Sequence, residues 1–158
     1  MKGKFVLTAL AAAASAAPGQ AQMVQAQDPE SVVKAMHSAG FTAKLGVDKI
    51  GEPKIDSSVG GTKFFVFFYN CVEKKECATV QFQSAYKLEK SVTLDRINEW
   101  NRSQRFGRAY LDKEGDPVIE MDLDLDDGGL SPGLFTDNLE FWGAIVGKFE
   151  RHIGYRGE

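Results

Sequence analysis

Lys63–Tyr69, with the sequence KFFVFFY, is a nearly unbroken apolar run. Such a run predicts a central β-strand that is covered on both faces. The following stretch, Cys77–Gln83, alternates apolar with polar side chains, which predicts a partner strand with one wetter face. The two stretches therefore predict a strand pair in the interior of an antiparallel sheet.

The chain contains two cysteines, Cys71 and Cys77, which flank the loop between these two strands. In an exported chain, which the N-terminus predicts, two cysteines form a disulfide by default. The spacing is not that of a C-x-x-C motif, and no further cysteine or nearby histidine completes a metal site. We therefore expect a structural disulfide rather than a redox pair or a metal centre.

Two segments that lie 64 positions apart share one pattern, VDKIGEPKI at Val47–Ile55 and LDKEGDPVI at Leu111–Ile119. Glycine supplies an unusual backbone angle and proline ends strand pairing, so each segment predicts a hairpin turn. Because each hairpin follows a capped helix, the sequence indicates a helix-plus-hairpin unit that is used twice. The alternative is a chance likeness between two turns.

The second hairpin predicts a register if Lys113–Pro117 is its loop. Arg108 then faces Asp122, and Tyr110 faces Glu120, on a polar face of the sheet. A cross-strand ion pair contributes about 0.2–1 kcal/mol, so replacing Arg108 should cost little if it is part of the scaffold. If Arg108 belongs to a binding surface instead, its replacement should reduce partner binding.

Three helices are indicated by their ends and by their apolar stripes. Asp28, Pro29 and Gly40 mark the ends of the first helix, and Thr93 starts the second. The second helix should face inward with Leu94, Ile97 and Trp100. The third has the longest stripe, formed by Phe135, Leu139, Trp142, Val146, Phe149 and Ile153 and widened by Leu134, Phe141 and Ile145. The element order is then α-ββ-ββ-α-ββ-α, an α+β fold with helices packed on an antiparallel sheet.

The N-terminus has the features of a secretory signal peptide. Lys2 and Lys4 precede the apolar run Phe5–Ala14, which is shorter than the roughly 20 residues that cross a bilayer. Small residues follow, so we expect cleavage after Ala21, with a competing site after Ala16.

These features divide the chain into a signal peptide at 1–21, a flexible leader at 22–27 and one α+β domain at 28–154. The expected product is a soluble periplasmic or secreted protein without stable membrane insertion. The formal net charge of −3 becomes two units more negative without the signal peptide. An acidic chain argues against nucleic acid as a partner.

No catalytic pattern is found in the sequence. His37 and His152 lie on expected helices near opposite ends of the chain, with no nucleophile motif beside them. Asp122–Gly128 resembles the start of a calcium loop, but Asp127 and Gly133 stand where that loop needs glycine and glutamate. We expect no catalytic residue, no metal and no cofactor.

The segment Asn98–Asp112 interleaves arginines with aromatic side chains. Such a pattern can bind nucleic acid, but an export signal and a net negative charge favour a structural hinge or a protein-binding surface. The candidate partner surface consists of Arg102, Arg105, Phe106, Arg108, Tyr110 and Asp112.

Parts of this segment resemble the YbjN-domain proteins, a family described as bacterial sensory transduction regulators. The resemblance rests on Trp100-Asn101, Arg105–Asp112, Gly115-Asp116-Pro117 and Glu120-Met121-Asp122. It covers about Asp28–Ile153, and the two-cysteine hairpin resembles that of exported members. The resemblance implies an α+β fold similar to that of type III secretion chaperones, which are often dimeric, and it brings no catalytic residues.

We therefore expect a non-enzymatic, exported binding or regulatory module that is chaperone-like or sensory-regulator-like. Its protein partner is unidentified, and a homodimer is compatible with the resemblance. The alternatives are a structural or stress-related envelope protein and an undetected enzyme. A buried site with paired titratable groups would favour the enzyme, whereas an exposed apolar groove or a two-fold interface would favour the module.

Overall fold

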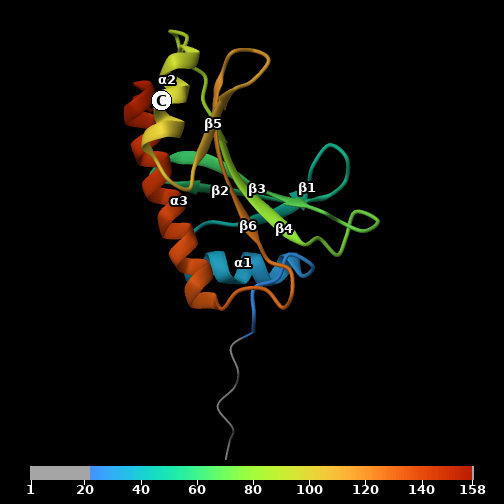
Figure 1. Cartoon of the computed structure of the whole chain (residues 1–158). Helices are drawn as coiled ribbons and strands as arrows, with labels where there is room; N and C mark the ends of the chain where they lie inside the picture. Colours follow the sequence, from blue (N-terminus) through green and yellow to red (C-terminus); the bar gives the residue numbers. More distant parts are fainter. Residues whose placement is uncertain (1–21, 158) are drawn as a thin grey trace, which may run out of the picture.

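The computed structural model describes residues 22–157 and contains three helices and six strands in that range (Figure 1). The elements are α1 (Pro29–Ser38), β1 (Lys44–Val47), β2 (Pro53–Val59), β3 (Thr62–Tyr69), β4 (Thr79–Ala85), α2 (Leu94–Ser103), β5 (Arg108–Leu111), β6 (Pro117–Asp124) and α3 (Pro132–Ile153). The strands form one antiparallel sheet in the order β1-β2-β3-β4-β6-β5. This arrangement confirms the predicted α+β fold and its element order.

The central strand pair is confirmed, together with its disulfide. β3 pairs with β4 from Phe65↔Gln83 to Tyr69↔Thr79, and Cys71 is bonded to Cys77 in the connecting loop. The prediction that β3 is covered on both faces is wrong. Phe64, Val66 and Phe68 are buried under helices, whereas Phe65 and Phe67 are only half-buried on the other face.

All three helices pack on one face of the sheet, and the apolar side chains between them form the core (Figure 1). The six predicted stripe residues of α3 are buried, and so is Ile145. Leu134 and Phe141 were expected to widen this stripe but are about half exposed. They lie outside the arc of α3 that touches the sheet, because the stripe of six already fills the space beneath the helix.

The helix ends follow the predicted signals, except that the side chain of Asp28 makes no capping hydrogen bond. α1 begins at Pro29, and Gly40 has a left-handed backbone just beyond its end. The hydroxyl of Thr93 accepts a hydrogen bond from the backbone N–H of Arg96 at the start of α2. Leu94 was expected to face inward but is 65% exposed, whereas Ile97 and Trp100 are buried as expected.

The two predicted hairpin turns have the same hydrogen bonds. The carboxylate of Asp48 accepts from the backbone N–H groups of Ile50 and Glu52, and that of Asp112 accepts from Glu114 and Asp116. The backbone N–H of each aspartate also donates to the carbonyl four residues later. Both hairpin predictions are therefore confirmed, and the two hairpins lie at opposite ends of the sheet.

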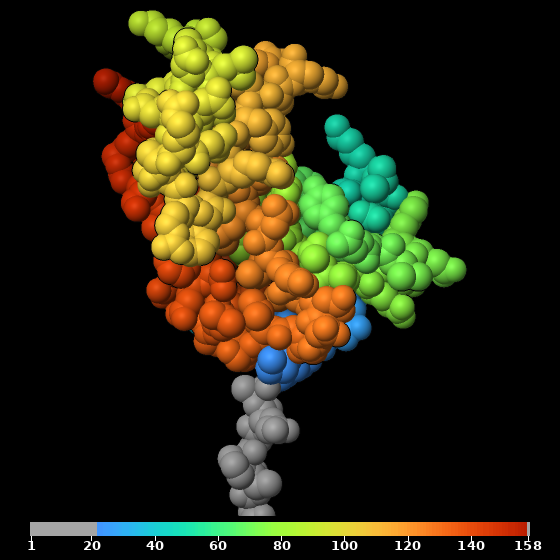
Figure 2. All heavy atoms as spheres, in the orientation of Figure 1, coloured from blue at the N-terminus to red at the C-terminus, as the bar shows by residue number. Residues whose placement is uncertain are grey.

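The predicted register of the second hairpin is wrong by two residues. Arg108 faces Glu120 and Tyr110 faces Val118, because Asp112 closes the turn instead of pairing with a strand residue. The predicted phase is correct, since Arg108 and the acidic side chains share the face without helices. Figure 2 shows a hollow on the molecular surface between the two hairpin turns.

The segment before α1 is not the flexible leader that its polarity suggested. Val24 and Ala26 are buried, and the backbone of Val24 exchanges two hydrogen bonds with Leu130. Two small apolar side chains are enough to anchor this segment against the core. The expected signal peptide at 1–21 lies outside the described residues. Among the helices of residues 22–157, none is long and apolar enough to cross a membrane.

Candidate functional site

The segment that carries the sequence motif joins the end of α2 to β5 by side-chain hydrogen bonds. The indole N–H of Trp100 donates to the carbonyl of Gly107 over 3.0 Å in the core. The amide of Asn101 donates to the carbonyl of Ala109 and accepts from its N–H, each over 2.9 Å. Asn101 thus satisfies the outward-facing backbone groups of an edge strand, so these motif residues are scaffold.

Gly107 is part of the same scaffold because its position has no room for a side chain. A Cβ atom there would lie 2.7 Å from Cγ2 of Ile145 and 3.1 Å from Cδ1 of Ile119. The chain therefore passes directly over the core at this point. The close approach explains why a glycine stands between two long side chains, Phe106 and Arg108.

Phe106 differs from these scaffold residues in both its backbone and its exposure. Its φ of 71° lies in the left-handed region, which is uncommon for a bulky side chain. The ring is 58% exposed and stacks on Phe141 of α3, with the ring centroids 5.2 Å apart. The guanidinium of Arg105 lies 4.9 Å from the centre of the Phe106 ring. The strained backbone thus presents an aromatic pair on the surface.

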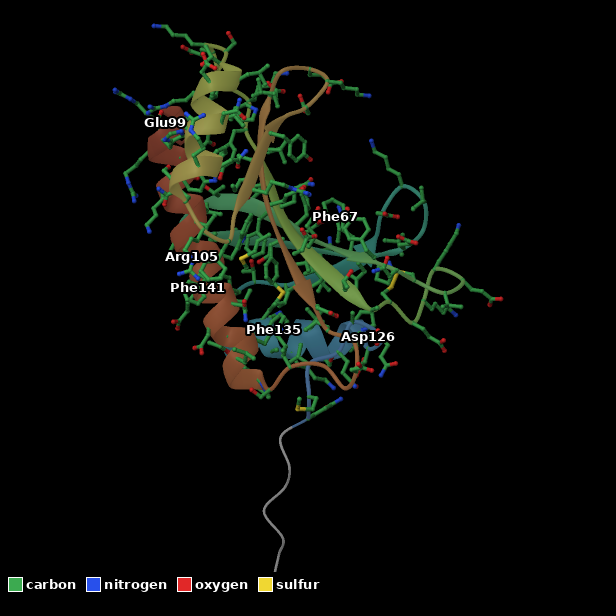
Figure 3. The ribbon with its side chains drawn as sticks, viewed as in Figure 1. Phe67, Glu99, Arg105, Asp126, Phe135 and Phe141 are labelled. Atoms are coloured by element: carbon green, nitrogen blue, oxygen red, sulfur yellow. A yellow bond between two sulfur atoms is a disulfide. The ribbon has the colours of Figure 1, made fainter. Side chains whose placement is uncertain are left out.

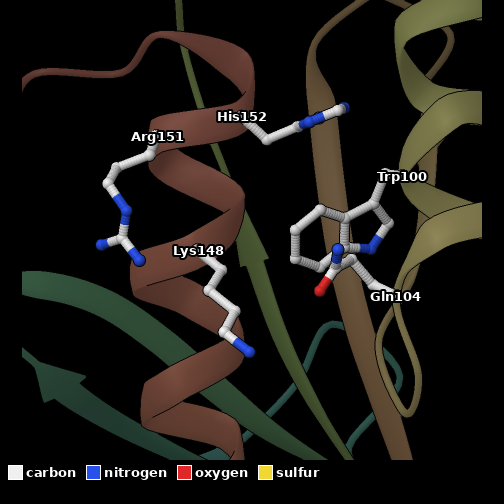
Figure 4. A pocket seen from close by; sticks show the side chains of 5 residues that line it. All are labelled: Trp100, Gln104, Lys148, Arg151 and His152. Atoms are coloured by element: carbon white, nitrogen blue, oxygen red, sulfur yellow. The ribbon is translucent and has the colours of Figure 1, made fainter.

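A shallow surface groove between α2 and α3, which we call the α2–α3 groove, begins at this pair. One part, about 280 Å³ in volume, lies between Phe106, Phe141 and Lys148. The next part, about 470 Å³, is lined by Trp100, Gln104, Lys148, Arg151 and His152 (Figure 4). Trp100, Gln104 and Lys148 line both parts, so the groove is continuous along the two helices.

The charge of the α2–α3 groove is positive. Arg105, Lys148 and Arg151 line it, and none of them forms an ion pair with a carboxylate within the described part of the chain. Figure 3 labels Arg105 and Phe141 side by side on the helical side of the molecule. The groove therefore combines exposed aromatic rings with three available cations in a protein whose net charge is negative.

His152 fastens the two walls of the groove together. Its Nε2 lies 2.7 Å from the carbonyl of Arg96, while Nε of Arg96 donates to the carbonyl of His152 over 2.9 Å. The ring also packs on Trp100, with centroids 5.6 Å apart. These contacts assign His152 a structural role between α2 and α3.

The other half of the expected partner surface faces the opposite side of the sheet. Nε of Arg108 donates to Oε1 of Glu120 over 3.0 Å, and a second guanidinium nitrogen contacts the same oxygen. Glu120 is only 5% exposed although no helix covers this face. The hydrogen bond and the charge of Glu120 raise the pKa of Arg108 above its usual value.

A row of polar side chains extends from this ion pair across the sheet. The amide of Gln81 donates to Asp122 over 2.8 Å, and that of Gln83 lies 3.4 Å from Glu120. Burial raises the pKa of the Tyr69 and Tyr110 phenols, and the negative charge of Glu120 raises both further. Both phenols are therefore protonated at neutral pH. This row holds neighbouring strands together by side-chain contacts.

The structure separates the six residues of the expected partner surface. Arg105 and Phe106 line the α2–α3 groove, Arg108 and Tyr110 lie on the opposite face, and Asp112 is used in the hairpin turn. Arg102 is exposed near the end of α2. Within residues 22–157, no three histidine, cysteine, aspartate or glutamate side chains come together in a way that could hold a metal ion.

Sequence reasoning missed the residues that α3 contributes to the groove, namely Phe141, Lys148 and Arg151. The sequence pattern places Phe141 on the apolar stripe of α3 and does not mark Lys148 or Arg151 as binding residues. Their spacing of seven and three residues, which places them on one side of a helix, was the available signal.

Comparison with known proteins agrees with this fold and motif. Residues 28–154 match the model of the YbjN family, whose description is "Putative bacterial sensory transduction regulator". No curated protein matches the chain. Because the family match spans most of the sequence and contains both the α2–β5 scaffold and the disulfide hairpin, the chain belongs to the YbjN family.

Proposed function

We propose that this protein is an exported, non-enzymatic regulator that binds a protein partner in the α2–α3 groove. The partner contributes an apolar side chain that sits against Phe106 and Phe141, with carboxylates on either side of it. The family description supports a regulatory role at the coarse level. The charged and apolar start of the chain, followed by small residues, supports export, and a disulfide is typical of an exported domain.

The exposed aromatic pair is the observation that carries this proposal. Phe106 holds a left-handed backbone while its ring lies on the surface, so its conformation costs free energy that no core contact returns. Backbone strain on a residue whose side chain stays on the surface often occurs at functional sites. Aromatic and arginine side chains are also the residue types that contribute most to protein interfaces.

The positive charge of the α2–α3 groove supports an acidic partner. Arg105, Lys148 and Arg151 line the groove without a carboxylate partner in the described residues, so an acidic segment would gain three favourable contacts. Opposite charges across an interface raise the association rate and exclude wrong partners. An acidic segment with one large apolar side chain would fit both the aromatic pair and the three cations of the groove.

The alternative functions have weaker support. A catalytic site needs titratable groups that converge in a sheltered pocket. The groove is open to solvent, and its histidine is hydrogen-bonded to a backbone carbonyl of the other helix. A purely structural envelope protein would not need an exposed aromatic pair beside three cations. Binding therefore accounts for more of the observed features than either alternative.

Site-specific photocrosslinking in the native host tests the proposal. A photoreactive residue replaces Phe141, and the same replacement at Leu134 is the control because Leu134 is equally exposed on the same helix. We expect one defined protein adduct from position 141, in the envelope fraction, and none from position 134. The adduct should be lost when Arg105→Glu and Lys148→Glu are combined with the probe, because both changes reverse the charge of the groove.

Equal adducts from positions 141 and 134 would indicate non-specific capture and would contradict the groove as the binding site. Absence of any adduct from position 141 would contradict it as well. An adduct that survives the two charge reversals would exclude the acidic class of partner. The control for the charge reversals is the double variant Lys87→Glu with Lys113→Glu. It reverses the same number of exposed positive charges at positions away from the groove.

A further inference from the structure

A polar cavity, which we call the tail cavity, lies where the last described residues of the chain pass the end of the sheet. Its volume is about 610 Å³, within the range of pockets that hold small molecules. Four segments line it, namely the Gly60-Gly61 turn, the end of β4, the last turns of α3 and the tail at 155–157. Because the turn consists of two glycines, none of its side chains extends over the cavity.

The charge of the tail cavity is positive. Four basic side chains and one acidic side chain line it, namely Lys63, Lys87, Arg151, Arg156 and Glu150. Lys87 contacts Asp116 over 3.2 Å, whereas the other three basic side chains form no ion pair within residues 22–157. Positive charges that gather in one cavity of an acidic protein indicate a negatively charged ligand.

Arg151 lies between the α2–α3 groove and the tail cavity, and its guanidinium is directed towards the tail cavity. Figure 4 shows this group turned away from Trp100. It lies over Gly147, where an added Cβ would be 3.6 Å from Nη1 of the arginine. Gly147 also lines the tail cavity, so the absence of a side chain there makes room for the guanidinium.

The tail is fixed at the cavity by contacts with α3 and with Tyr86. The backbone N–H of Tyr155 donates to the carbonyl of Glu150 over 2.9 Å. The Tyr155 ring packs edge-to-face on the Tyr86 ring, with the centroids 5.0 Å apart. Arg156 follows directly, so its backbone is held at the cavity before a ligand binds, which reduces the ordering cost of binding.

Tyr86 supplies a buried donor without an acceptor in the described part of the chain. The residue lines the tail cavity and is only 3% exposed. The hydroxyl of Ser84 donates to the carbonyl of Lys63, over 3.0 Å, and not to the phenol. Native proteins rarely leave a buried hydroxyl without a partner, so an acceptor on a ligand would complete the hydrogen bonding of this site.

We propose that the tail cavity binds a phosphate group, which accepts hydrogen bonds from Tyr86 and Arg156 and whose charge is balanced by Arg151 and Lys63. The paired N–H donors of a guanidinium match the oxygens of a phosphate. Three positive charges without an ion pair exceed what one carboxylate balances, which favours a phosphate that carries nearly two negative charges. This site is separate from the partner site in the α2–α3 groove and does not depend on it.

The acidic side chain of the cavity limits the kind of phosphate. Glu150 accepts a hydrogen bond from the hydroxyl of Thr62. Its negative charge opposes a second phosphate, while its carboxylate can accept from a hydroxyl of the ligand. A second hollow, about 780 Å³ in volume, adjoins the cavity along the tail and gives room for an organic group. The expected ligand is therefore a phosphate monoester with hydroxyl groups, either a free small molecule or the headgroup of a lipid.

Titration of the full-length protein with three probes tests the site. Inorganic phosphate and glycerol 3-phosphate are titrated by calorimetry at low ionic strength, and vesicles that contain phosphatidic acid are tested by flotation. We expect one site per chain, with glycerol 3-phosphate bound more tightly than inorganic phosphate because its hydroxyl groups reach Glu150. Capture by these vesicles without binding of glycerol 3-phosphate would assign the phosphate to a lipid, and the reverse result would assign it to a free small molecule.

Two variants each remove one contact to the phosphate. Arg156→Gln should raise the dissociation constant about tenfold or more, because it removes a charged donor. Tyr86→Phe keeps the packing of the ring, so the fold should be kept, and it should raise the dissociation constant about threefold to tenfold. Lys113→Gln and Tyr69→Phe are the matched controls, since neither residue lines the cavity and neither change should alter the affinity.

A variant of the α2–α3 groove separates this site from the partner site. Arg105→Glu combined with Lys148→Glu should leave the affinity for phosphate within about twofold of the wild type, because both residues lie outside the tail cavity. A large loss of phosphate binding in this double variant would place the phosphate in the groove and contradict the tail cavity as its site.

Three further results would overturn the proposal. The first is the absence of binding by all three probes at millimolar concentration. The second is equal weakening by Arg156→Gln and Lys113→Gln, which would indicate a general attraction between charges. The third is a dissociation constant unchanged by both Arg156→Gln and Tyr86→Phe, since the phosphate must then bind to another surface.

Discussion

The ion pair between Arg108 and Glu120 joins two side chains of very different exposure. The side chain of Arg108 is 68% exposed, and that of Glu120 is 6% exposed. Replacing the arginine therefore costs more than the exchange of two surface charges. It leaves a buried carboxylate with a weak contact to Gln83 and the neighbouring phenol of Tyr110.

Arg108→Ala should lower the free energy of unfolding by about 1–2 kcal/mol, a value reduced for the exposure of the guanidinium. Arg108→Lys should lose less, because it keeps the charge and loses only the two-pronged contact. Chemical denaturation measures both, and Arg102→Ala, at an exposed position on α2, should stay within about 0.5 kcal/mol of the wild type. A loss for Arg108→Ala no larger than that for Arg102→Ala would show that the pair is not scaffold.

For single residues, the sequence predicted which face of the sheet a side chain occupies better than it predicted which residue lies opposite. Alternation placed Arg108 on the polar face correctly, because the side-chain period of a strand is local information. Its partner depends on where the turn closes, and Asp112 closes the turn through its side chain. Because the turn begins at Asp112, one residue earlier than predicted, Arg108 lies opposite Glu120 instead of Asp122.

The loop between Cys71 and Cys77 is an element whose conformation conflicts with its sequence. The N–H of Lys75 donates to the carbonyl of Val72, which forms a four-residue turn. Glu73 and Lys74 occupy its centre with φ values of 49° and 63°, although such turns favour Asn and Gly there. The disulfide holds a turn that its own residues disfavour.

Glu73→Asn combined with Lys74→Gly should therefore raise the free energy of unfolding by about 1–2 kcal/mol, since each of the two left-handed residues costs about 1 kcal/mol or more and the added glycine returns part of the gain by making the unfolded chain more flexible. Chemical denaturation with the disulfide intact measures the gain. Lys75→Gly is the matched control, because Lys75 lies outside the left-handed region and a glycine there should only add flexibility to the unfolded chain. A double variant less stable than the wild type would contradict this account.

Elements with local signals were predictable. Thr93 and Pro29 mark helix starts through backbone chemistry that involves only neighbouring residues, and the Gly-acid-Pro pattern marks both hairpins. Coverage of the sheet was not predictable in the same way. The KFFVFFY strand suggested two covered faces, but Phe65 and Phe67 instead pack on each other, and Lys54 lies over Phe65.

For the whole molecule, contacts between distant segments cover part of the β5 edge and shape the surface of α3, and sequence alone did not reveal them. Asn101 resembles any polar residue on an exposed helix face until α2 is placed beside β5. Similarly, Phe141 belonged to an apolar stripe that was wider than the sheet beneath it. Both residues depend on contacts between segments far apart in sequence, which local patterns do not encode.

Stability at alkaline pH depends on tyrosines from both sides of the molecule. Burial is the main cause that raises the pKa of Tyr69, Tyr86 and Tyr110 above 10.0, and nearby carboxylates raise it further. Tyr86 has the largest shift; Ser84 lies near enough to its buried hydroxyl to lower the pKa, but the two form no hydrogen bond of normal geometry in the described part of the chain. Because each pKa is higher in the folded protein, the unfolded chain loses its phenol protons first as pH rises. The stability contributed by these groups is complete below pH 10.0 and decreases above it.

Tyr86→Phe should remove the largest part of this alkaline loss. At neutral pH the variant should be as stable as the wild type or more stable by about 1 kcal/mol, because it removes an unsatisfied buried hydroxyl and keeps the ring contacts with Phe149 and Tyr155. The free energy of unfolding, measured against pH from neutral to strongly alkaline, should fall less steeply in Tyr86→Phe than in the wild type. Tyr69→Phe is the comparison, since Tyr69 is 41% exposed and its replacement should change the slope less. Parallel curves for Tyr86→Phe and the wild type would show that the Tyr86 phenol does not control alkaline stability, and a neutral-pH loss above about 1 kcal/mol would show that its hydroxyl has a partner after all.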